Sequence, residues 1–528
     1  MSDWIGYRWL AERHGVCPVQ AWDVESCIGP SRRTITNDGL TTQIYTSNMR
    51  PENTLAAHLT FAIKHEGVHL EFLARLFASL PAEEIAGWMR RERTGQYARR
   101  IGFLWEWLMG RPLEGVPDVT GGNYVNALDP QRVLCNPQAR NHPRWRVRDN
   151  LPGNRHFCPT VRRSPAVIEA ESYDCRQQLD ALQAEYGTDI LMRSAVWLTV
   201  KESRASFQIE HEDDKTDRIQ RFAALMERRC GEEVRPLVRE TLADLQREVI
   251  GDKSTFSHFG LRLSPVFVGE TAGFQEQVHY VAPPWERLDE LLDGMEAFIE
   301  RSAGASALAR AAVVAFGFVY IHPLADGNGR IHRFLINDIL RRDGAVPRPY
   351  ILPISAAITH KPQDRARYDM ILERFSRPLM ARYGDAYRFE ADTREYADGI
   401  WSNFVFSAYE DALPAWRYPD LTAHVEYLAA LIDQTIRTEM KEEARLLRCW
   451  DQARRAVKNE IEGPNTHIDR IIRAVLGNGG RVSHKLAKEF AVLADASVAA
   501  NVAQAIQEAF EASERDGKQG GEDTGAEA

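Results

Sequence analysis

One short segment, residues 321–333, gathers most of the residue types that phosphate chemistry uses. It reads Ile-His-Pro-Leu-Ala-Asp-Gly-Asn-Gly-Arg-Ile-His-Arg. The His322 side chain can act as a general base near neutral pH, and Asp326 offers a hard oxygen ligand of the kind that Mg²⁺ prefers. We therefore expect a base and a metal-binding carboxylate on one loop.

The second half of this segment predicts an anion site. Gly327 and Gly329 flank Asn328 and allow backbone N–H groups to come close to an anion. The helix expected to begin here presents further unpaired N–H groups at its positive end. Arg330 and Arg333 are three residues apart, so they share a helix face, and two guanidinium groups there suit a polyphosphate.

Other interpretations of the segment explain less of it. Gly-Asn-Gly alone is a common turn, and His-Pro alone is a common helix end. A dinucleotide-binding glycine motif does not fit, because His332 stands where the third glycine should be and a helix, not a strand, is expected before the loop. A zinc site at His322 and His332 lacks the usual ligand spacing and further ligands.

The segment resembles the Fic family signature, H-x-F-x-[D/E]-G-N-G-R-x-x-R. It matches at every specified position but one: His322, Asp326, Gly327, Asn328, Gly329, Arg330 and Arg333. The exception is Leu324, where the family usually has Phe to anchor the loop in the core, so an apolar replacement should be tolerated. The loop has Gly-Asn-Gly and not the Ala-Asn-Gly of the related Doc kinases, which favours nucleotidyl transfer over phosphorylation.

The resemblance implies a protein adenylyltransferase that uses ATP and Mg²⁺. His322 would deprotonate a Ser, Thr or Tyr hydroxyl of a target protein, and that oxygen would attack the α-phosphorus of ATP. Asp326 would hold Mg²⁺. The phosphates would be bound by the other motif residues, Gly327, Asn328, Gly329, Arg330 and Arg333. The alternatives are a nucleotide-sensing regulatory or DNA-binding protein, or an enzyme that mainly removes AMP. The intact His322 favours the transferase over a sensor, because sensing alone needs no base.

A second motif lies upstream of the first. Residues 206–211, Ser-Phe-Gln-Ile-Glu-His, resemble the inhibitory pattern [S/T]-x-x-x-E-[G/N] of many Fic proteins, with His211 in the last position. The resemblance implies that Ser206 and Glu210 are inhibitory, with Glu210 pairing with Arg333 and displacing the γ-phosphate. The same Glu could orient a water that removes AMP. A solvated helix face is the alternative interpretation.

The elements that must position these residues are mainly helical. Apolar spacing predicts a helix over 305–320 before the motif and another over 331–342 after it. Residues 261–281 hold two short β-rich runs joined by a Gly-containing turn, which predicts a hairpin. This hairpin resembles the flap on which Fic proteins dock the target protein by strand addition.

We expect a mainly α fold with a Fic-type helical core and divide the chain into six parts. These are a mostly helical N-terminal domain of unknown role (1–165), a helical segment with the inhibitory motif (166–250), the Fic core (251–375), a helical extension (376–460), a small winged-helix-like module (465–512) and a disordered tail (513–528). The last helix of the module, 498–510, has no Lys or Arg. Because phosphate contacts supply much of DNA affinity, protein docking is favoured over DNA binding there.

Composition sets wider limits. The 528 residues carry a net charge of −9, which argues against nucleic-acid binding by the chain as a whole. The seven cysteines are scattered without a C-x-x-C pair, which favours reduced thiols and a cytoplasmic protein. We see no signal peptide and no stretch long enough to span a membrane, so we expect no membrane association. The sequence does not decide whether the protein forms a homo-oligomer.

Overall fold

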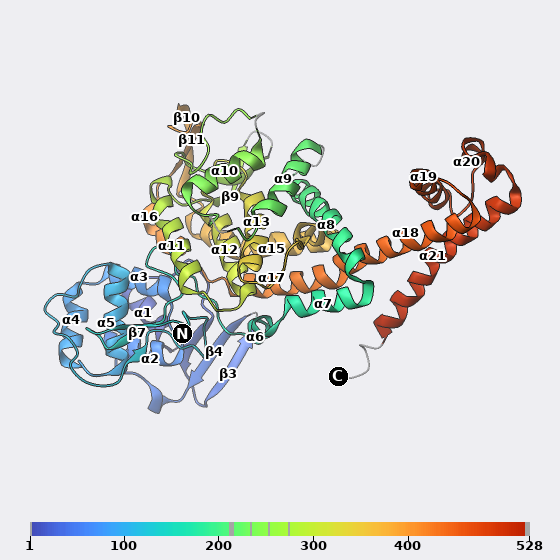
Figure 1. Cartoon of the computed structure of the whole chain (residues 1–528). Coiled ribbons are helices and arrows are strands. Elements are labelled where there is room, and N and C mark those ends of the chain that lie inside the picture. The colour runs from blue at the N-terminus through green and yellow to red at the C-terminus, as the bar shows by residue number, and fades with distance from the viewer. Residues whose placement is uncertain are drawn as a thin grey trace. The chain divides into compact units, whose positions relative to one another are not determined.

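A computed structural model gives the structure of the chain (Figure 1). It describes residues 3–37, 39–210, 216–232, 235–251, 254–272 and 275–522. The chain forms two compact units, the first from residues 1–174, 203–347 and 354–432 and the second from 175–202, 348–353 and 433–528. The prediction of a mainly α fold is confirmed. Among the described residues, every helix is too short or too polar to cross a membrane.

The N-terminal part of the first unit is not mostly helical as we expected. A four-stranded sheet in the order β1-β2-β4-β3 lies beside its helices. The strands are β1 (Trp4–Ile5), β2 (Val24–Ile28), β3 (Arg33–Asn37) and β4 (Leu40–Tyr45). Threonine, isoleucine and valine are frequent in β2, β3 and β4 and favour extended backbone, but the runs are too short for the helical spacing on which our prediction depended.

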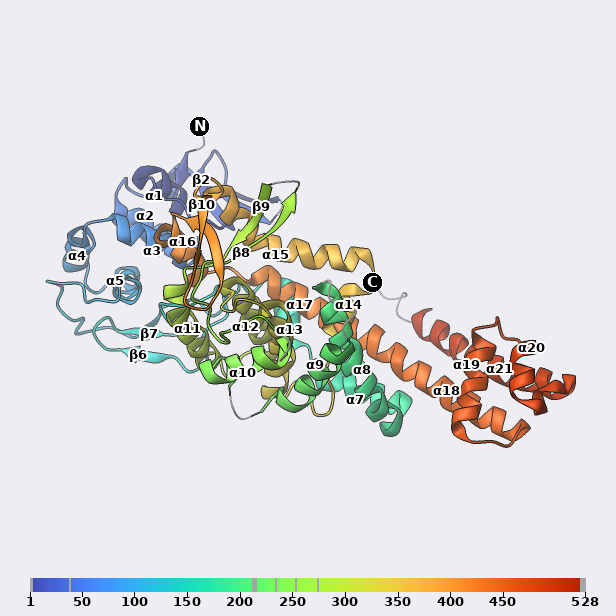
Figure 2. The same cartoon turned by 90° about the horizontal axis from the view of Figure 1, so that it is seen from above.

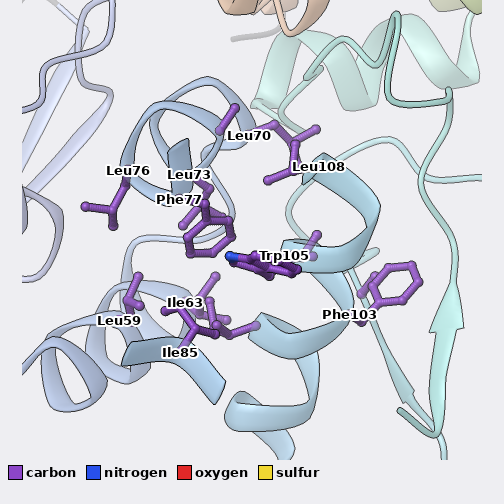
Figure 3. Packing of buried hydrophobic residues seen from close by; sticks show 14 of the residues in the cluster. Leu59, Ile63, Leu70, Leu73, Leu76, Phe77, Ile85, Phe103, Trp105 and Leu108 are labelled. Atoms are coloured by element: carbon purple, nitrogen blue, oxygen red, sulfur yellow. The ribbon is translucent and has the colours of Figure 1, made fainter. Parts of the chain in front are cut away.

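Helices supply most of the core of this region. They are α1 (Tyr7–His14), α2 (Leu55–His65), α3 (Leu70–Ser79), α4 (Ala82–Arg91) and α5 (Gln96–Met109). Figure 3 shows Phe77 of α3 facing Trp105 of α5, with Leu73 beside them. Leu73 is completely buried, and the two aromatic side chains are each 2% exposed. The apolar faces of these helices therefore pack against one another in one buried cluster.

Residues 143–165, which are rich in arginine and proline, pack into the first unit. A small sheet in the order β5-β7-β6 precedes and crosses this stretch, with β5 at Val125–Asn126, β6 at Arg140–His142 and β7 at Val147–Asp149. The Trp145 ring is buried, and its Nε1–H donates to Glu106 Oε2 at 2.6 Å. Arg144 pairs with Glu106 Oε1 at 2.9 Å. The sequence did not predict this packing, because Trp145 is surrounded by arginine and proline and belongs to no apolar pattern.

The middle of the chain forms helices and one hairpin. The helices before the hairpin are α6 (Pro165–Ser172), α7 (Cys175–Tyr186), α8 (Thr188–Ile209), α9 (Thr216–Arg229) and α10 (Arg239–Ile250). The hairpin pairs β8 (Phe267–Ala272) with β9 (Gln275–Val281) in antiparallel register, Phe267 opposite Val281. After it come the short 3₁₀ helix η2 (Trp285–Arg287), α11 (Leu288–Arg301), α12 (Ala307–Ile321) and α13 (Asn328–Arg342).

The part after α13 is not only helical. It contains α14 (Ile354–Thr359), α15 (Pro362–Tyr383), α16 (Tyr409–Arg417) and α17 (Thr422–Gln434), but also a second hairpin. Its strands are β10 (Tyr387–Glu395) and β11 (Trp401–Phe406). The helical extension expected over 376–460 is therefore interrupted by a hairpin that the sequence did not predict. Alternating aromatic and polar residues, such as Tyr387 and Phe389, stabilise extended backbone here because their rings lie on one face.

The second unit has its own helical core. The π-helical turn η3 (Thr435–Met440) leads into α18 (Lys441–Glu460), which packs against α21 (Ala496–Glu522). Between them lie α19 (Asn465–Leu476), α20 (His484–Glu489) and the 3₁₀ turn η4 (Ala491–Ala494). Residues 465–522, all of which have a described backbone, contain no strand, so this module lacks the wing of a winged helix.

Helix α21 also extends beyond the end that we expected. It continues to Glu522, whereas we predicted disorder from residue 513. Glu514, Arg515, Lys518 and Gln519 are good helix formers, whereas Gly517, Gly520 and Gly521 are poor ones. Extending an existing helix is much easier than starting a new one, which offsets the glycines. Residues 523–528 lie outside the described part of the chain.

Candidate active site

The candidate base, His322, ends the most completely buried helix of the core. Helix α12 is apolar on almost all sides, and His322 follows it with a left-handed backbone conformation, φ 49° and ψ 56°. This conformation closes the helix, since the His322 N–H still donates to Phe318 O at 2.9 Å. A left-handed residue other than Gly, Asn or Asp carries strain, and such strain is frequent at functional sites.

One ring nitrogen of His322 is committed to the backbone. Nδ1 lies 3.2 Å from Val319 O, and because a carbonyl oxygen can only accept, Nδ1 must carry the proton of this bond. Nε2 is then the ring atom with a lone pair. Burial, helped by the nearby positive charge of Arg262, lowers the pKa of His322 to about 4. At neutral pH the imidazole is therefore uncharged and able to accept a proton at Nε2.

The side chain of Asn328 holds the loop between α12 and α13. Its Oδ1 accepts from Leu324 N–H at 3.0 Å, and its Nδ2 donates to Leu324 O at 2.8 Å. Leu324 is completely buried, as expected for the residue that replaces the usual Phe. Gly327, with φ of 91°, takes a turn that a side chain would strain. The buried Asn328 side chain thus fixes the backbone of the loop between α12 and α13.

Replacing Asn328 with alanine is expected to destabilise the protein by about 1–3 kcal/mol, because the N–H and C=O of Leu324 would both lose a buried partner. Thermal unfolding followed by circular dichroism measures the change. The Asn328→Asp variant keeps the acceptor for Leu324 N–H but loses the donor to Leu324 O. Its melting temperature should therefore lie between that of the alanine variant and that of the parent. Equal melting temperatures for parent and alanine variant would contradict this role.

Arg330, in the first turn of α13, forms an ion pair with Asp326 on the loop before it. Arg330 donates to Asp326 Oδ1 at 3.1 Å, and its side chain is 3% exposed while that of Asp326 is 46% exposed. The guanidinium also lies over the Phe207 ring, 5.1 Å from its centroid. Among the described residues no group of three or more His, Cys, Asp or Glu side chains could hold a metal by itself. An accessible single carboxylate fits Mg²⁺ that arrives with nucleotide phosphates.

Arg333 is held by the upstream motif. Its side chain is completely buried, and its Nε donates to Ser206 Oγ at 2.8 Å. One terminal nitrogen donates to Ser206 O at 3.1 Å and to Glu210 Oε1 at 2.6 Å. Two residues that are more than a hundred positions away in the sequence therefore contact the last arginine of the motif.

The carboxylate of Glu210 lies directly over the first turn of α13. A Cβ atom built on Gly329 would be 2.2 Å from Glu210 Oε1, so only glycine permits this approach. Burial raises the pKa of Glu210, but the charge and hydrogen bond of Arg333, helped by Arg330 and Arg365, lower it by more. The ion pair is therefore complete at neutral pH and is lost only as the pH falls below the ordinary range of Glu, about 4.3.

The end of the helix that carries Glu210 is fixed by α15. Arg365 of α15 donates to Ile209 O at 3.2 Å, which satisfies a terminal carbonyl of α8. His211, the residue that departs from the inhibitory pattern, lies outside the described residues. The placement of Glu210 is thus set by Arg333 and Arg365 within the part of the chain that is described.

The hairpin β8–β9 is joined to the loop after α12 through its entry segment. Leu261 and Leu324 form an isolated antiparallel bridge, and Arg262 N–H donates to Pro323 O at 2.9 Å. The hairpin was expected over 261–281, and its strands occupy 267–272 and 275–281. Gly273 and Phe274, within the turn, lie outside the described residues.

Three polar residues near the motif were not predicted from the sequence. Gln246 of α10 donates to Asp326 O at 3.0 Å and accepts from Gly260 N–H at 2.7 Å. Arg262 and Asp398 are buried beside the hairpin. A lone charged residue between Leu261 and Leu263 was a weak sign of burial, but nothing in the sequence indicates which groups it contacts.

Comparison with known proteins identifies the domain that carries this site. Residues 236–340 match the model of the Fic/DOC family, and this range contains α10, the hairpin β8–β9, α12 and the motif. The chain therefore contains a Fic/DOC-family domain. The matched range begins before residue 251 and ends before 375, the limits that we expected.

Curated relatives agree over the same kind of short span. The chain is 30% identical over 117 residues to "Protein adenylyltransferase fic-1" of Caenorhabditis briggsae, which is 22% of this chain and 21% of that protein. The protein of the same name from Caenorhabditis elegans is 30% identical over 115 residues, with the same coverage. The chain thus matches about a fifth of the length of these relatives.

A solved structure is also similar. It is that of a Fic family protein from Desulfovibrio desulfuricans G20, with 19% sequence identity and a TM-score of 0.35. The match covers 57% of this chain and 82% of that one.

Proposed function

We propose that this protein is an adenylyltransferase that moves AMP from ATP to a hydroxyl of a target protein and is inhibited by its own Glu210. The observation that carries this proposal is that His322, with its lowered pKa, ends α12 on the loop that leads into α13, whose first two turns bear Arg330 and Arg333. A base beside an anion-binding helix end is what attack of a hydroxyl on a phosphorus atom requires. The names of the curated relatives support the same reaction class.

In this mechanism Nε2 of His322 takes the proton from a Ser, Thr or Tyr hydroxyl as its oxygen attacks the α-phosphorus. The bond from that phosphorus to the bridging oxygen breaks, and pyrophosphate leaves. The hydrogen bond from Nδ1–H to Val319 O keeps the ring in the tautomer that has its lone pair at Nε2. The same carbonyl stabilises the imidazolium that forms once the proton has been taken.

The N-terminal end of α13 supplies the charge that the phosphates need. Backbone N–H groups from Gly327 to Gly329 and the guanidinium groups of Arg330 and Arg333 all carry positive charge or partial charge. Such fixed donors stabilise the developing negative charge without reorganising during the reaction. Asp326 would hold Mg²⁺, which would neutralise the phosphate oxygens, and this would replace its ion pair with Arg330.

Inhibition follows from the place that Glu210 occupies. Its carboxylate contacts Arg333 and the backbone at Gly329, which are groups that we assign to the phosphates. A negative charge at this point repels a terminal phosphate and removes its arginine partner. ATP can still bind in this state, but with its phosphates displaced from the position that in-line attack needs. Removal of AMP, with Glu210 orienting a water, remains the alternative activity of the same site.

The Glu210→Gly variant is expected to transfer AMP roughly 5–150-fold faster than the parent, the usual range for coupling between two sites. The measurement is incorporation of label from α-³²P-ATP with Mg²⁺ into the protein itself or into added lysate proteins. Glu210→Gln keeps the side-chain size but not the charge and should also be faster than the parent. If neither variant incorporates label, while both bind ATP by calorimetry, the transferase proposal is wrong and nucleotide sensing is the better explanation.

A further inference from the structure

A buried arginine lies between the hairpin β8–β9 and the candidate base. Arg262 is 1% exposed, and each part of its guanidinium donates to a different backbone carbonyl. Nε donates to His322 O at 2.8 Å, one terminal nitrogen to Ser264 O at 2.8 Å and the other to Pro283 O at 2.6 Å. These carbonyls belong to the base itself, to the entry of the hairpin and to its exit.

The geometry requires an arginine at this position. A guanidinium has five N–H donors in a rigid planar fork, so it can reach three carbonyls in different directions, whereas a lysine ammonium is a single flexible point. Burial lowers the pKa of Arg262 to about 10, so the group keeps its charge at neutral pH. Among the described residues Arg262 makes no ion pair, so carbonyl dipoles supply its direct contacts.

The entry of the hairpin is also held from the second hairpin. Asp398, between β10 and β11, is 3% exposed. Its Oδ2 accepts from Leu263 N–H and from Ser264 Oγ, both at 2.7 Å. A segment more than a hundred residues downstream thus fixes the two residues that follow Arg262.

Aromatic packing joins the same two hairpins. The Phe267 ring of β8 lies 5.4 Å from that of Phe389 in β10 and 4.8 Å from that of Phe404 in β11. In Figure 2 the strands β8, β9 and β10 lie close together. The second hairpin therefore supports the first at its entry through Asp398 and along β8 through these rings.

We propose that Arg262 and Asp398 are positioning residues that fix the hairpin β8–β9 and His322 relative to each other. This inference rests on the proposed function and deepens it, because a hydroxyl docked on the hairpin must arrive within hydrogen-bond distance of Nε2. Arg262 joins the hairpin to the His322 backbone, and Asp398 holds the hairpin entry against Arg262. A displacement of about 1 Å at this junction is enough to cost on the order of 100-fold in rate.

Arg262 has an electrostatic effect as well as a geometric one. Two charged groups act on His322: Arg262, from the segment before β8, which disfavours the imidazolium, and Glu210, at the end of α8, which favours it. Loss of the Arg262 charge should therefore raise the pKa of His322. Arg262→Lys keeps a charge without the fork, and Arg262→Met keeps neither, so the two variants separate the two effects.

The test uses the full-length chain with Glu210→Gly and compares Arg262→Lys, Arg262→Met and Asp398→Asn. We expect label transfer from α-³²P-ATP to fall on the order of 100-fold in both Arg262 variants. The pKa of His322 should rise in Arg262→Met and stay low in Arg262→Lys. It is measured by NMR titration of ¹³C-labelled histidine, with the signal assigned from its loss in His322→Ala.

Asp398→Asn is the milder variant, because it keeps the size of the side chain and one acceptor. We expect its rate to fall about tenfold and amide hydrogen exchange within residues 263–283 to become faster. Asp392→Asn, at an exposed position of β10, is the matched control and should change neither. Binding of a non-hydrolysable ATP analogue should be unchanged in all four variants, since none of these side chains is assigned to the phosphates.

Two outcomes would overturn the inference. One is a transfer rate in Arg262→Lys and Asp398→Asn equal to that of the Glu210→Gly chain. The other is hydrogen exchange in Asp398→Asn equal to that of Asp392→Asn. If the Glu210→Gly chain itself transfers no label, the proposed function fails, and the exchange and titration experiments still decide whether this pair fixes the hairpin and the histidine.

Discussion

In the Glu210→Gly chain, replacing His322 with alanine is expected to lower AMP transfer by about 10²–10⁴-fold, the usual contribution of a positioned general base. The rate of label incorporation from α-³²P-ATP measures the loss. Binding of an ATP analogue should be nearly unchanged, because His322 is assigned to the hydroxyl and not to the phosphates. His484→Ala, at an exposed position of α20, controls for the loss of an imidazole elsewhere.

The same base predicts the acid side of the pH–rate profile. Burial lowers the pKa of His322 to about 4, and the base acts only in its neutral form. The transfer rate should therefore be flat from neutral pH down to about pH 5 and fall as the pH passes through 4. A rate that already halves near pH 6.5, the ordinary pKa of histidine, would mean that the ring is solvated and not buried.

The second large effect is expected in the N-terminal core, where Leu73→Ala should lower the free energy of unfolding by about 2–5 kcal/mol. Leu73 is completely buried between α3 and its neighbouring helices (Figure 3), so its removal loses transfer free energy and leaves a cavity. Urea unfolding, followed by circular dichroism and by tryptophan fluorescence, measures the shift in the unfolding transition of the N-terminal core.

Leu446→Ala is the matched control for this substitution. Leu446 lies on α18 and is 39% exposed, so the same change of side chain on a helix should alter stability by no more than about 0.5 kcal/mol. Equal shifts for the two variants would mean that Leu73 does not belong to a close-packed core. Catalytic variants such as His322→Ala should leave the unfolding transition of the N-terminal core unchanged.

Much of the domain that carries the site could be predicted from local pattern. The apolar run before the motif predicted α12, the glycines predicted the turn, and the two β-rich runs predicted the hairpin β8–β9. These predictions succeeded because each depends on residues within one helix or one turn. The sheets of the N-terminal region and the hairpin β10–β11 were missed, since short strands depend on partners that lie elsewhere in the chain.

The sequence by itself determined which chemical groups are present: a histidine, a carboxylate, a glycine-rich turn and two arginines in one segment. That segment folds locally, so the types and spacing of its residues are enough to place them around the start of one helix. The sequence also contained the serine and glutamate of residues 206–210, but a five-residue pattern alone cannot show which group they contact.

Only the tertiary structure decided the contacts between segments that are far apart in the chain. It brings Glu210 to Arg333 and Gly329, and it brings Asp398 to the two residues that follow Arg262. The physical reason is that buried polar groups must find partners wherever the packed helices and strands leave them, and those partners depend on the whole fold. The sequence therefore determines the reacting groups, and the tertiary structure determines how they are restrained and aligned.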